Sequence, residues 1–179
     1  MAFLRGMNLG GRRIKNEELR AEFEALGFEE VATFRASGNV VFATAKKSES
    51  ALAKRIEHGL GEALGYEVPV FLRSCAEVAA IAGQKPFDDA ELARSKGKLQ
   101  ISLLGKKPTA AARKKVLALA AADDLLACAG RELYWLPSGG LVESDLDLKT
   151  IEATLGRDTR RTMGTIEQIA AKHCSGPSC

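Results

Sequence analysis

The sequence predicts an α+β protein built as two similar ferredoxin-like halves (βαββαβ-type), each with an antiparallel sheet and helices packed on one face. Two observations predict this class. Short runs rich in β-branched and aromatic residues alternate with segments whose apolar residues recur every three or four positions, and the alternation occurs twice along the chain. The expected organisation is a first half over 1–74, a helical connector over 75–96, a second half over 97–173 and a tail over 174–179.

The first half is expected to run β-α-β-β-α-β, because turn and cap residues separate its apolar segments. The expected elements are a strand at 2–6, a helix from an N-cap at Asn16 to Gly27, strands at 31–35 and 39–43, a helix from Ser48 or Ser50 to Gly65, and a strand at 67–73. Gly59 and Gly61 inside the second helix each cost up to about 1 kcal/mol relative to alanine. That helix therefore depends on tertiary packing.

The connector and the second half follow from the same signals. We expect a short helix at 75–82, a further helical turn at 90–96, a strand at 98–104, a helix from Pro108 and Thr109 to Ala120, strands at 125–128 and 132–136, a helix from Ser144 or Asp147 to Gly156, and a last helix from Thr162 or Thr165 to Lys172. The pattern of the second half is β-α-β-β-α, followed by one more helix.

Composition and charge set broad limits on function. The 179 residues are 46% hydrophobic and 27% charged, which is typical of a globular protein. No run approaches the roughly 18 apolar residues that span a bilayer, and the N-terminus lacks a signal-peptide pattern. We expect a cytoplasmic protein that has no membrane partner. A net charge of +3 permits an anionic partner without requiring one.

Metal and cofactor chemistry is not indicated. The four cysteines form no C-x-x-C pair, so neither a disulfide framework nor a zinc site is expected. His173, Cys174 and Cys179 read as the end of the chain, and the acidic pairs Asp88-Asp89 and Asp123-Asp124 read as connector and turn residues. We expect no cofactor.

Catalysis by a familiar triad is not predicted either. The chain has two histidines, His58 within a helix and His173 near the C-terminus, and neither has a nucleophile beside it in sequence. The nucleophile-elbow and zinc-protease motifs do not occur. Catalytic residues therefore stay undefined at the sequence level.

The N-terminal loop is the main candidate site. Glycines 6, 10 and 11 alternate there with polar and basic residues, namely Arg5, Asn8, Arg12, Arg13 and Lys15. Glycines let a backbone approach a ligand closely, while arginine and lysine hold phosphate or carboxylate, and a helix N-terminus follows. The alternative is a strand-to-helix loop with a solvated basic face, in which Asn8 bonds the backbone.

A second candidate is the turn formed by Ser37, Gly38 and Asn39. It is expected at the same end of the sheet as the N-terminal loop, since both adjoin strand ends. Ser37 and Asn39 would then contact a ligand. Alternatively, their side chains stabilise the turn itself, because serine and asparagine form hydrogen bonds with nearby backbone groups.

Several segments resemble the bacterial domain-of-unknown-function family numbered 1697. They are FLRGMNLGGRRIK, EALGF, SGNVVF, LYWLPSGGL and TIEQIAA, and together they extend over nearly the whole chain. The family's last motif reads Thr-Arg-Asn-Trp-x-Thr, against residues 160–165 here. Arg161 and Thr165 match, whereas the asparagine and tryptophan are absent. The resemblance makes Arg161 a candidate ligand contact, with a helix-flanking surface arginine as the alternative. It implies no activity.

Three functions stay open. The first is a non-catalytic module that binds an anionic ligand, either a small molecule or nucleic acid: a nucleotide, RNA, phosphate or carboxylate. An outward-facing Tyr134 or Trp135 would suit base stacking. The second is a small enzyme that acts on an anionic metabolite in a pocket between the halves. The third is a self-associating structural protein, although the sequence carries no signal for an oligomeric state.

Overall fold

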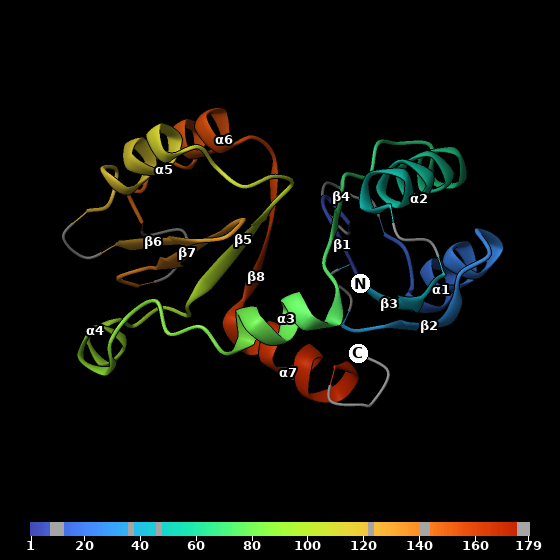
Figure 1. The fold of residues 1–179 in the computed structure, drawn as a ribbon, viewed down its shortest axis with the longest axis horizontal. Coiled ribbons are helices and arrows are strands. Elements are labelled where there is room, and N and C mark those ends of the chain that lie inside the picture. Colours follow the sequence, from blue (N-terminus) through green and yellow to red (C-terminus); the bar gives the residue numbers. More distant parts are fainter. Residues whose placement is uncertain (8–12, 36–37, 46–47, 122–123, 140–143, 175–179) are drawn as a thin grey trace. The chain divides into compact units, whose positions relative to one another are not determined.

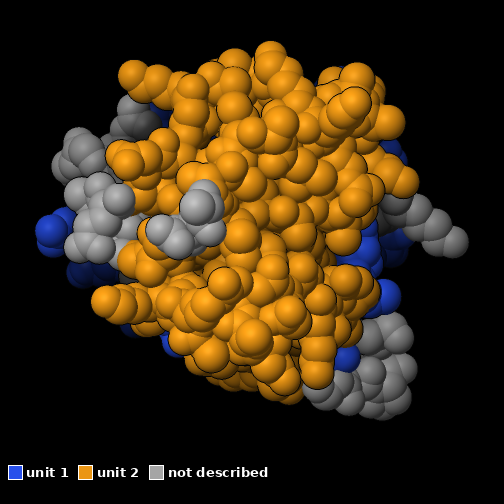
Figure 2. Space-filling model, turned by 90° about the vertical axis from the view of Figure 1, so that its left-hand side faces the viewer, with its two compact units in different colours: residues 1–77, 173–179 blue, residues 78–172 orange. Residues whose placement is uncertain are grey.

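The chain divides into two compact units, described one at a time from a computed structural model (Figure 1). The structure describes residues 1–7, 13–35, 38–45, 48–121, 124–139 and 144–174. Unit 1 comprises residues 1–77 and 173–179, and unit 2 comprises residues 78–172; Figure 2 colours them separately. Each unit contains a four-stranded antiparallel sheet.

Unit 1 has the element order β-α-β-β-α-β. Its elements are β1 (Ala2–Leu4), α1 (Asn16–Ala25), β2 (Glu29–Thr33), β3 (Asn39–Ala43), α2 (Glu49–Leu64) and β4 (Val70–Leu72). The strands lie in the order β2-β3-β1-β4. Phe3 in β1 is paired with Asn39 on one side and with Phe71 on the other. The two central strands, β3 and β1, therefore bring the N-terminal segment next to the hairpin.

The core of unit 1 forms where α1 and α2 cover one face of this sheet (Figure 1). Leu19 and Phe23 are the buried stripe of α1, and Ile56 and Leu60 belong to that of α2. Gly59 lies where the helices approach, since a Cβ there would be 2.4 Å from a methyl group of Leu26. Gly59 therefore weakens α2 by itself but allows the helix to pack closely against Leu26, which is a tertiary contact of the kind that the sequence leads us to expect.

Two short helices follow unit 1's last strand. They are α3 (Cys75–Ala82) and α4 (Asp89–Arg94). Val78 and Ile81 are buried, as the pattern predicts for the inward face of α3. A reciprocal capping box starts α4: the Asp88 carboxylate accepts from the Glu91 N–H at 2.7 Å, and the Glu91 carboxylate accepts from the Asp88 N–H at 2.7 Å.

Unit 2 repeats the element order and adds a terminal helix. Its elements are β5 (Gln100–Leu104), α5 (Ala110–Leu117), β6 (Leu125–Ala129), β7 (Glu132–Leu136), α6 (Leu148–Leu155), β8 (Asp158–Thr162) and α7 (Met163–His173). The strand order β6-β7-β5-β8 is the same arrangement as β2-β3-β1-β4. The two-sheet α+β class is therefore established, while the ferredoxin-like assignment of each half stays a prediction.

One face of the unit 2 sheet packs against α5 and α6 (Figure 1). Leu133 and Trp135 contribute to this core from β7, and Val116 contributes from α5. Asp124 organises the adjoining turn: its carboxylate accepts from Trp135 Nε1 at 2.8 Å and from the Ser144 hydroxyl at 2.8 Å. Asp124 is only 3% exposed, so the residue that the sequence predicts as part of a turn is a buried hydrogen-bond acceptor.

Three expectations about local structure are corrected. Asn16 is the first residue of α1, and the capping position is Lys15. Tyr134 and Trp135 are both buried, so neither points outward. The pattern gives no strand at 158–162, yet β8 pairs with β5 along its whole length. β8 is polar, reading Asp-Thr-Arg-Arg-Thr, so hydrophobic alternation does not reveal it.

No helix in these described ranges is both long and apolar enough to cross a membrane.

Candidate functional site

The N-terminal segment and the β2–β3 hairpin meet at Gly38. The Leu4 N–H donates to the Gly38 carbonyl at 2.8 Å. A Cβ on Gly38 would lie 2.8 Å from Met7 Cγ and 3.0 Å from Leu4 Cβ, and the φ of Gly38 is +69°. The lack of space requires glycine at this position, and the backbone conformation favours it. The prediction that the loop and the turn share one end of the sheet is thus correct for these residues.

Asn39 closes the hairpin. It is 2% exposed, and its side-chain amide donates to the Phe34 carbonyl at 2.9 Å. The Phe34 N–H donates in turn to the Asn39 carbonyl at 2.9 Å. These bonds are the turn chemistry that the sequence offered as one alternative. Ligand contact by Asn39 stays a prediction.

Three basic residues of the N-terminal loop lie within the described part. Arg5 is half-buried, and its N–H donates to the Pro69 carbonyl at 2.9 Å, whereas Arg13 and Lys15 are exposed. Gly6 has a φ of +76°, and no atom lies within 4 Å of a Cβ built on it. The remaining predicted residues, Asn8, Arg12 and Ser37, lie outside the described residues.

The start of α1 contributes less to anion binding than the sequence suggests. The Lys15 N–H already donates to the Glu18 carboxylate at 3.0 Å. Glu17 and Glu18 both lie in the first turn, where their negative charges offset the positive end of the helix dipole. The basic side chains and the glycine turns are therefore the features that could hold an anion.

Sequence reasoning missed Arg35. This exposed residue belongs to the same hairpin, has a φ of +55°, and places its guanidinium 5.7 Å from the centre of the Phe34 ring. The signal was available, because residues 31–48 include basic residues and no acidic one. Arg35 adds a cation to the hairpin side of the candidate site.

Arg161 lies in unit 2, where it is buried in β8. Its Nη1 donates to Thr159 Oγ1 at 2.9 Å and to the Arg160 carbonyl at 2.7 Å. Desolvation lowers the pKa of Arg161 to about 10, so the side chain stays charged at neutral pH. It is 8% exposed in a strand, so the alternative of a helix-flanking surface arginine is wrong. Its role as a ligand contact stays a prediction.

Thr162 caps the last helix. It stands where the resemblance implies an asparagine, directly before α7, and its hydroxyl accepts from the Thr165 N–H at 3.3 Å. The Thr162 and Thr165 hydroxyls lie 2.9 Å apart. Asparagine and threonine both cap helices through a side-chain oxygen. Met163, at the tryptophan position, is buried.

No group of three or more histidine, cysteine, aspartate or glutamate side chains in the described part of the chain could hold an ion.

Comparisons with known proteins bear on the family and the fold. The model of the family described as protein of unknown function DUF1697 matches residues 1–134. This range includes the N-terminal loop and the hairpin, and it ends before β8. The chain is similar in structure to the conserved bacterial protein SP0830 from Streptococcus pneumoniae, with a TM-score of 0.74 and 21% identity over 95% of this chain and 94% of that one. No curated protein sequence matches.

Proposed function

We propose that this chain, which belongs to the DUF1697 family of proteins of unknown function, is a non-catalytic module that binds an anionic ligand at its N-terminal loop. The observation that carries the proposal is the contact between Leu4 and Gly38. It joins two stretches that contain no acidic residue, 1–16 with four basic residues and 31–48 with three. A bound anion would face cations from both stretches.

The chemistry of this region suits phosphate or carboxylate. Arginine donates two parallel hydrogen bonds to either group, and Arg13 and Arg35 are both exposed to solvent. Gly6 presents its backbone without a side chain in the way. Such glycine turns allow main-chain N–H groups to approach an anion closely.

A small anion is favoured over a single-stranded nucleic acid. Recognition of single strands depends strongly on aromatic side chains on which bases stack. Tyr134 and Trp135, the aromatic residues proposed for that role, are both buried. A nucleotide, phosphate or carboxylate ligand needs no such platform.

Thermal unfolding in the presence of candidate ligands tests the proposal. The panel comprises inorganic phosphate, a nucleoside monophosphate, a dicarboxylate and a short oligonucleotide. A ligand that binds only the folded protein stabilises it by about 2.7 kcal/mol at 100 times its dissociation constant. We expect one class of small anion to raise the midpoint, and the shift to shrink with added salt.

Charge-removing variants locate the site. Arg13→Gln and Lys15→Gln should each weaken the ligand-induced shift, since each removes a cation from the loop. Lys54→Gln is the matched control, because Lys54 is an exposed lysine of α2 outside both basic stretches. Equal shifts in all three variants would refute the loop as the site, and the absence of any shift across the panel would refute anion binding.

A further inference from the structure

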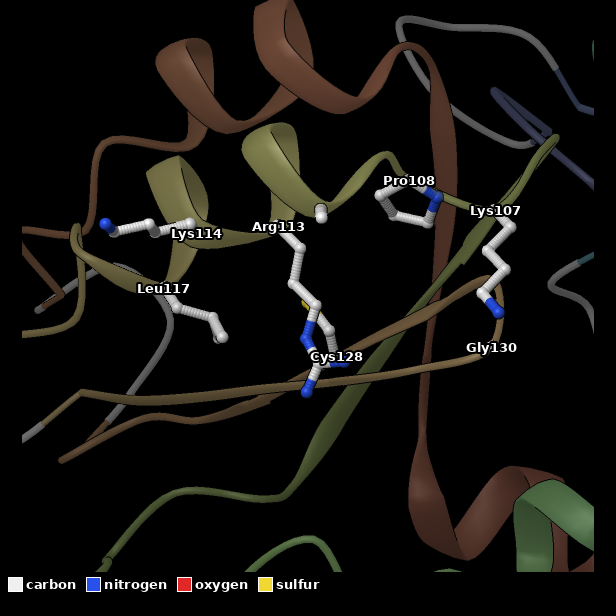
Figure 3. Close-up of a pocket in the computed structure, with 8 residues that line it drawn as sticks. Lys107, Pro108, Arg113, Lys114, Leu117, Cys128 and Gly130 are labelled. Atoms are coloured by element: carbon white, nitrogen blue, oxygen red, sulfur yellow. The ribbon is translucent and has the colours of Figure 1, made fainter.

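Unit 2 contains a basic pocket that none of the sequence motifs indicates. It lies between α5, with the loop before it, and the β6–β7 hairpin (Figure 3). Its volume is about 500 Å³, within the range of pockets that bind small molecules. Its lining is formed by Lys107, Pro108, Ala110, Arg113, Lys114, Leu117, Cys128 and Gly130.

The pocket combines two cations with an apolar surface. Figure 3 shows the Arg113 side chain extending from α5 to Cys128, and Lys107 reaching toward the end of the pocket near Gly130. Lys114 extends to the side, so it lines the rim. Leu117 and Cys128 supply the apolar part of the lining. The pocket therefore presents cationic side chains beside an apolar surface.

Among the described residues, no ion pair neutralises the two cations of this pocket, Lys107 and Arg113. Residues 105–122 contain five basic residues and no acidic one. Glu132 lies next to Gly130, but its carboxylate accepts from the Arg131 N–H at 3.1 Å. Glu132 also pairs with Ala129 rather than Cys128, which puts it on the opposite face of the hairpin from the pocket.

Cys128 forms part of the pocket wall as a neutral thiol. Burial raises the pKa of the Cys128 thiol, and the nearby Arg113 guanidinium offsets part of this rise. A raised pKa keeps most of the thiol protonated at neutral pH, so Cys128 contributes apolar surface, and its minor thiolate fraction reacts slowly with an alkylating agent. It also provides a reporter inside the pocket.

We propose that this pocket binds a small phosphorylated molecule, with its phosphate between Lys107 and Arg113 and its uncharged part over Leu117 and Cys128. The guanidinium is suited to bidentate binding of phosphate oxygens, and the ammonium adds a second charge. This proposal goes beyond the N-terminal loop, because the pocket lies in unit 2 and shares no residue with that loop.

Alkylation of Cys128 by iodoacetamide, followed by peptide mass spectrometry, tests the proposal with phenyl phosphate as the probe. At about ten times its dissociation constant, the probe should slow the alkylation of Cys128 roughly tenfold, because a tenth of the sites stay empty. The rates of Cys75 and Cys174 in unit 1 should not change, and they serve as internal controls. Inorganic phosphate should protect more weakly, since it lacks the apolar group.

Two variants of α5 define the binding geometry. Arg113→Gln should weaken the protection by phenyl phosphate about tenfold or more, as expected for loss of hydrogen bonds to a charged group. Lys115→Gln removes the same charge from an exposed residue of α5 that does not line the pocket, and it should leave the protection unchanged. The alkylation rate is compared with and without the probe in the same variant, because Arg113 also affects the pKa of the Cys128 thiol.

Three outcomes would overturn the proposal. Protection by phenol equal to that by phenyl phosphate would show that the phosphate is not recognised. Equal effects of Arg113→Gln and Lys115→Gln, with stronger protection by an oligonucleotide, would indicate a polyanion surface. No protection of Cys128 by any probe would exclude the pocket, while a thermal shift that depends on Arg13 and Lys15 would leave the N-terminal loop proposal intact.

Discussion

At the scale of single residues, Gly38 determines how closely the N-terminal segment approaches the hairpin. Its φ of +69° disfavours a side chain, and its contacts with Leu4 and Met7 leave no space for one. The sequence identifies Gly38 as a turn residue, which it is. Only the structure shows the second constraint, because Met7 and Leu4 are distant from Gly38 in sequence.

We predict that Gly38→Ala destabilises the protein more than Gly65→Ala does. Gly65 ends α2 with a similar φ of +74°, but no atom lies within 4 Å of its added Cβ. Gly65→Ala should therefore lose only the roughly 1–2 kcal/mol of a left-handed alanine. Gly38→Ala should lose a further 1–3 kcal/mol or so from overpacking. Chemical denaturation of both variants measures the difference, and equal losses would show that the contact with Leu4 and Met7 relaxes freely.

Thr162 caps α7, because its hydroxyl accepts from the Thr165 N–H. Thr162→Val should lower the free energy of unfolding by about 1 kcal/mol, because the Thr165 N–H loses its acceptor. Thr162→Asn should stay within about 0.5 kcal/mol of the parent, since asparagine caps at least as well. Urea unfolding at neutral pH compares the two. Equal destabilisation by both substitutions would contradict the capping role.

At the scale of the elements, the two glycines of α2 differ in whether packing requires them. Both weaken the helix by propensity alone, and the sequence treats them as equivalent. In the structure, a Cβ on Gly59 would meet Leu26 at 2.4 Å, whereas the closest atom to one on Gly61 is the Tyr66 carbonyl at 3.9 Å. Gly59 is thus required for the close approach to Leu26, and Gly61 is not.

Alanine substitutions in α2 should therefore act in opposite directions. Gly61→Ala should stabilise the protein by about 0.5–1 kcal/mol through helix propensity. Gly59→Ala gains the same propensity but should lose about 1–3 kcal/mol by overpacking against Leu26, which gives a net loss. Thermal unfolding of the two variants distinguishes them by the sign of the midpoint shift. Stabilisation by Gly59→Ala would show that the Leu26 side chain moves aside at little cost.

β8 shows where pattern reading fails at the element scale. Its alternating residues are polar on both faces, and Thr159 and Arg161 are nevertheless buried. β8 is recognised as a strand by its five paired positions with β5 rather than by its own hydrophobicity. Pairing between residues about 60 positions apart leaves no periodic signal in a local window.

At the scale of the whole molecule, each unit contains its own sheet with two central and two edge strands. In unit 2, β5 and β7 have partners on both sides and are buried along their length, whereas β6 is an edge strand of intermediate exposure. The stability of backbone hydrogen bonds should differ accordingly within the sheet.

Amide hydrogen exchange should reveal this difference. We expect the amides of β5 and β7 to exchange more slowly than those of β6, because an edge strand can open without disrupting the centre of the sheet. In unit 1, β1 and β3 should likewise be slower than β2. Exchange followed by mass spectrometry measures each strand. Uniform protection across one sheet would indicate that it opens only as a single cooperative unit.

The sequence by itself determined the α+β class, most helices and strands, the family and the loop in which to look for a site. These follow from local periodicity, turn residues and a specific N-terminal motif, which a linear chain records directly. Tertiary structure alone decided the contact of Gly38 with Leu4 and Met7, the burial of Arg161, the pairing of β8 and the basic pocket around Arg113 and Cys128. Each of these depends on which distant segments meet, and that is set by packing and strand register rather than by the composition of any one segment.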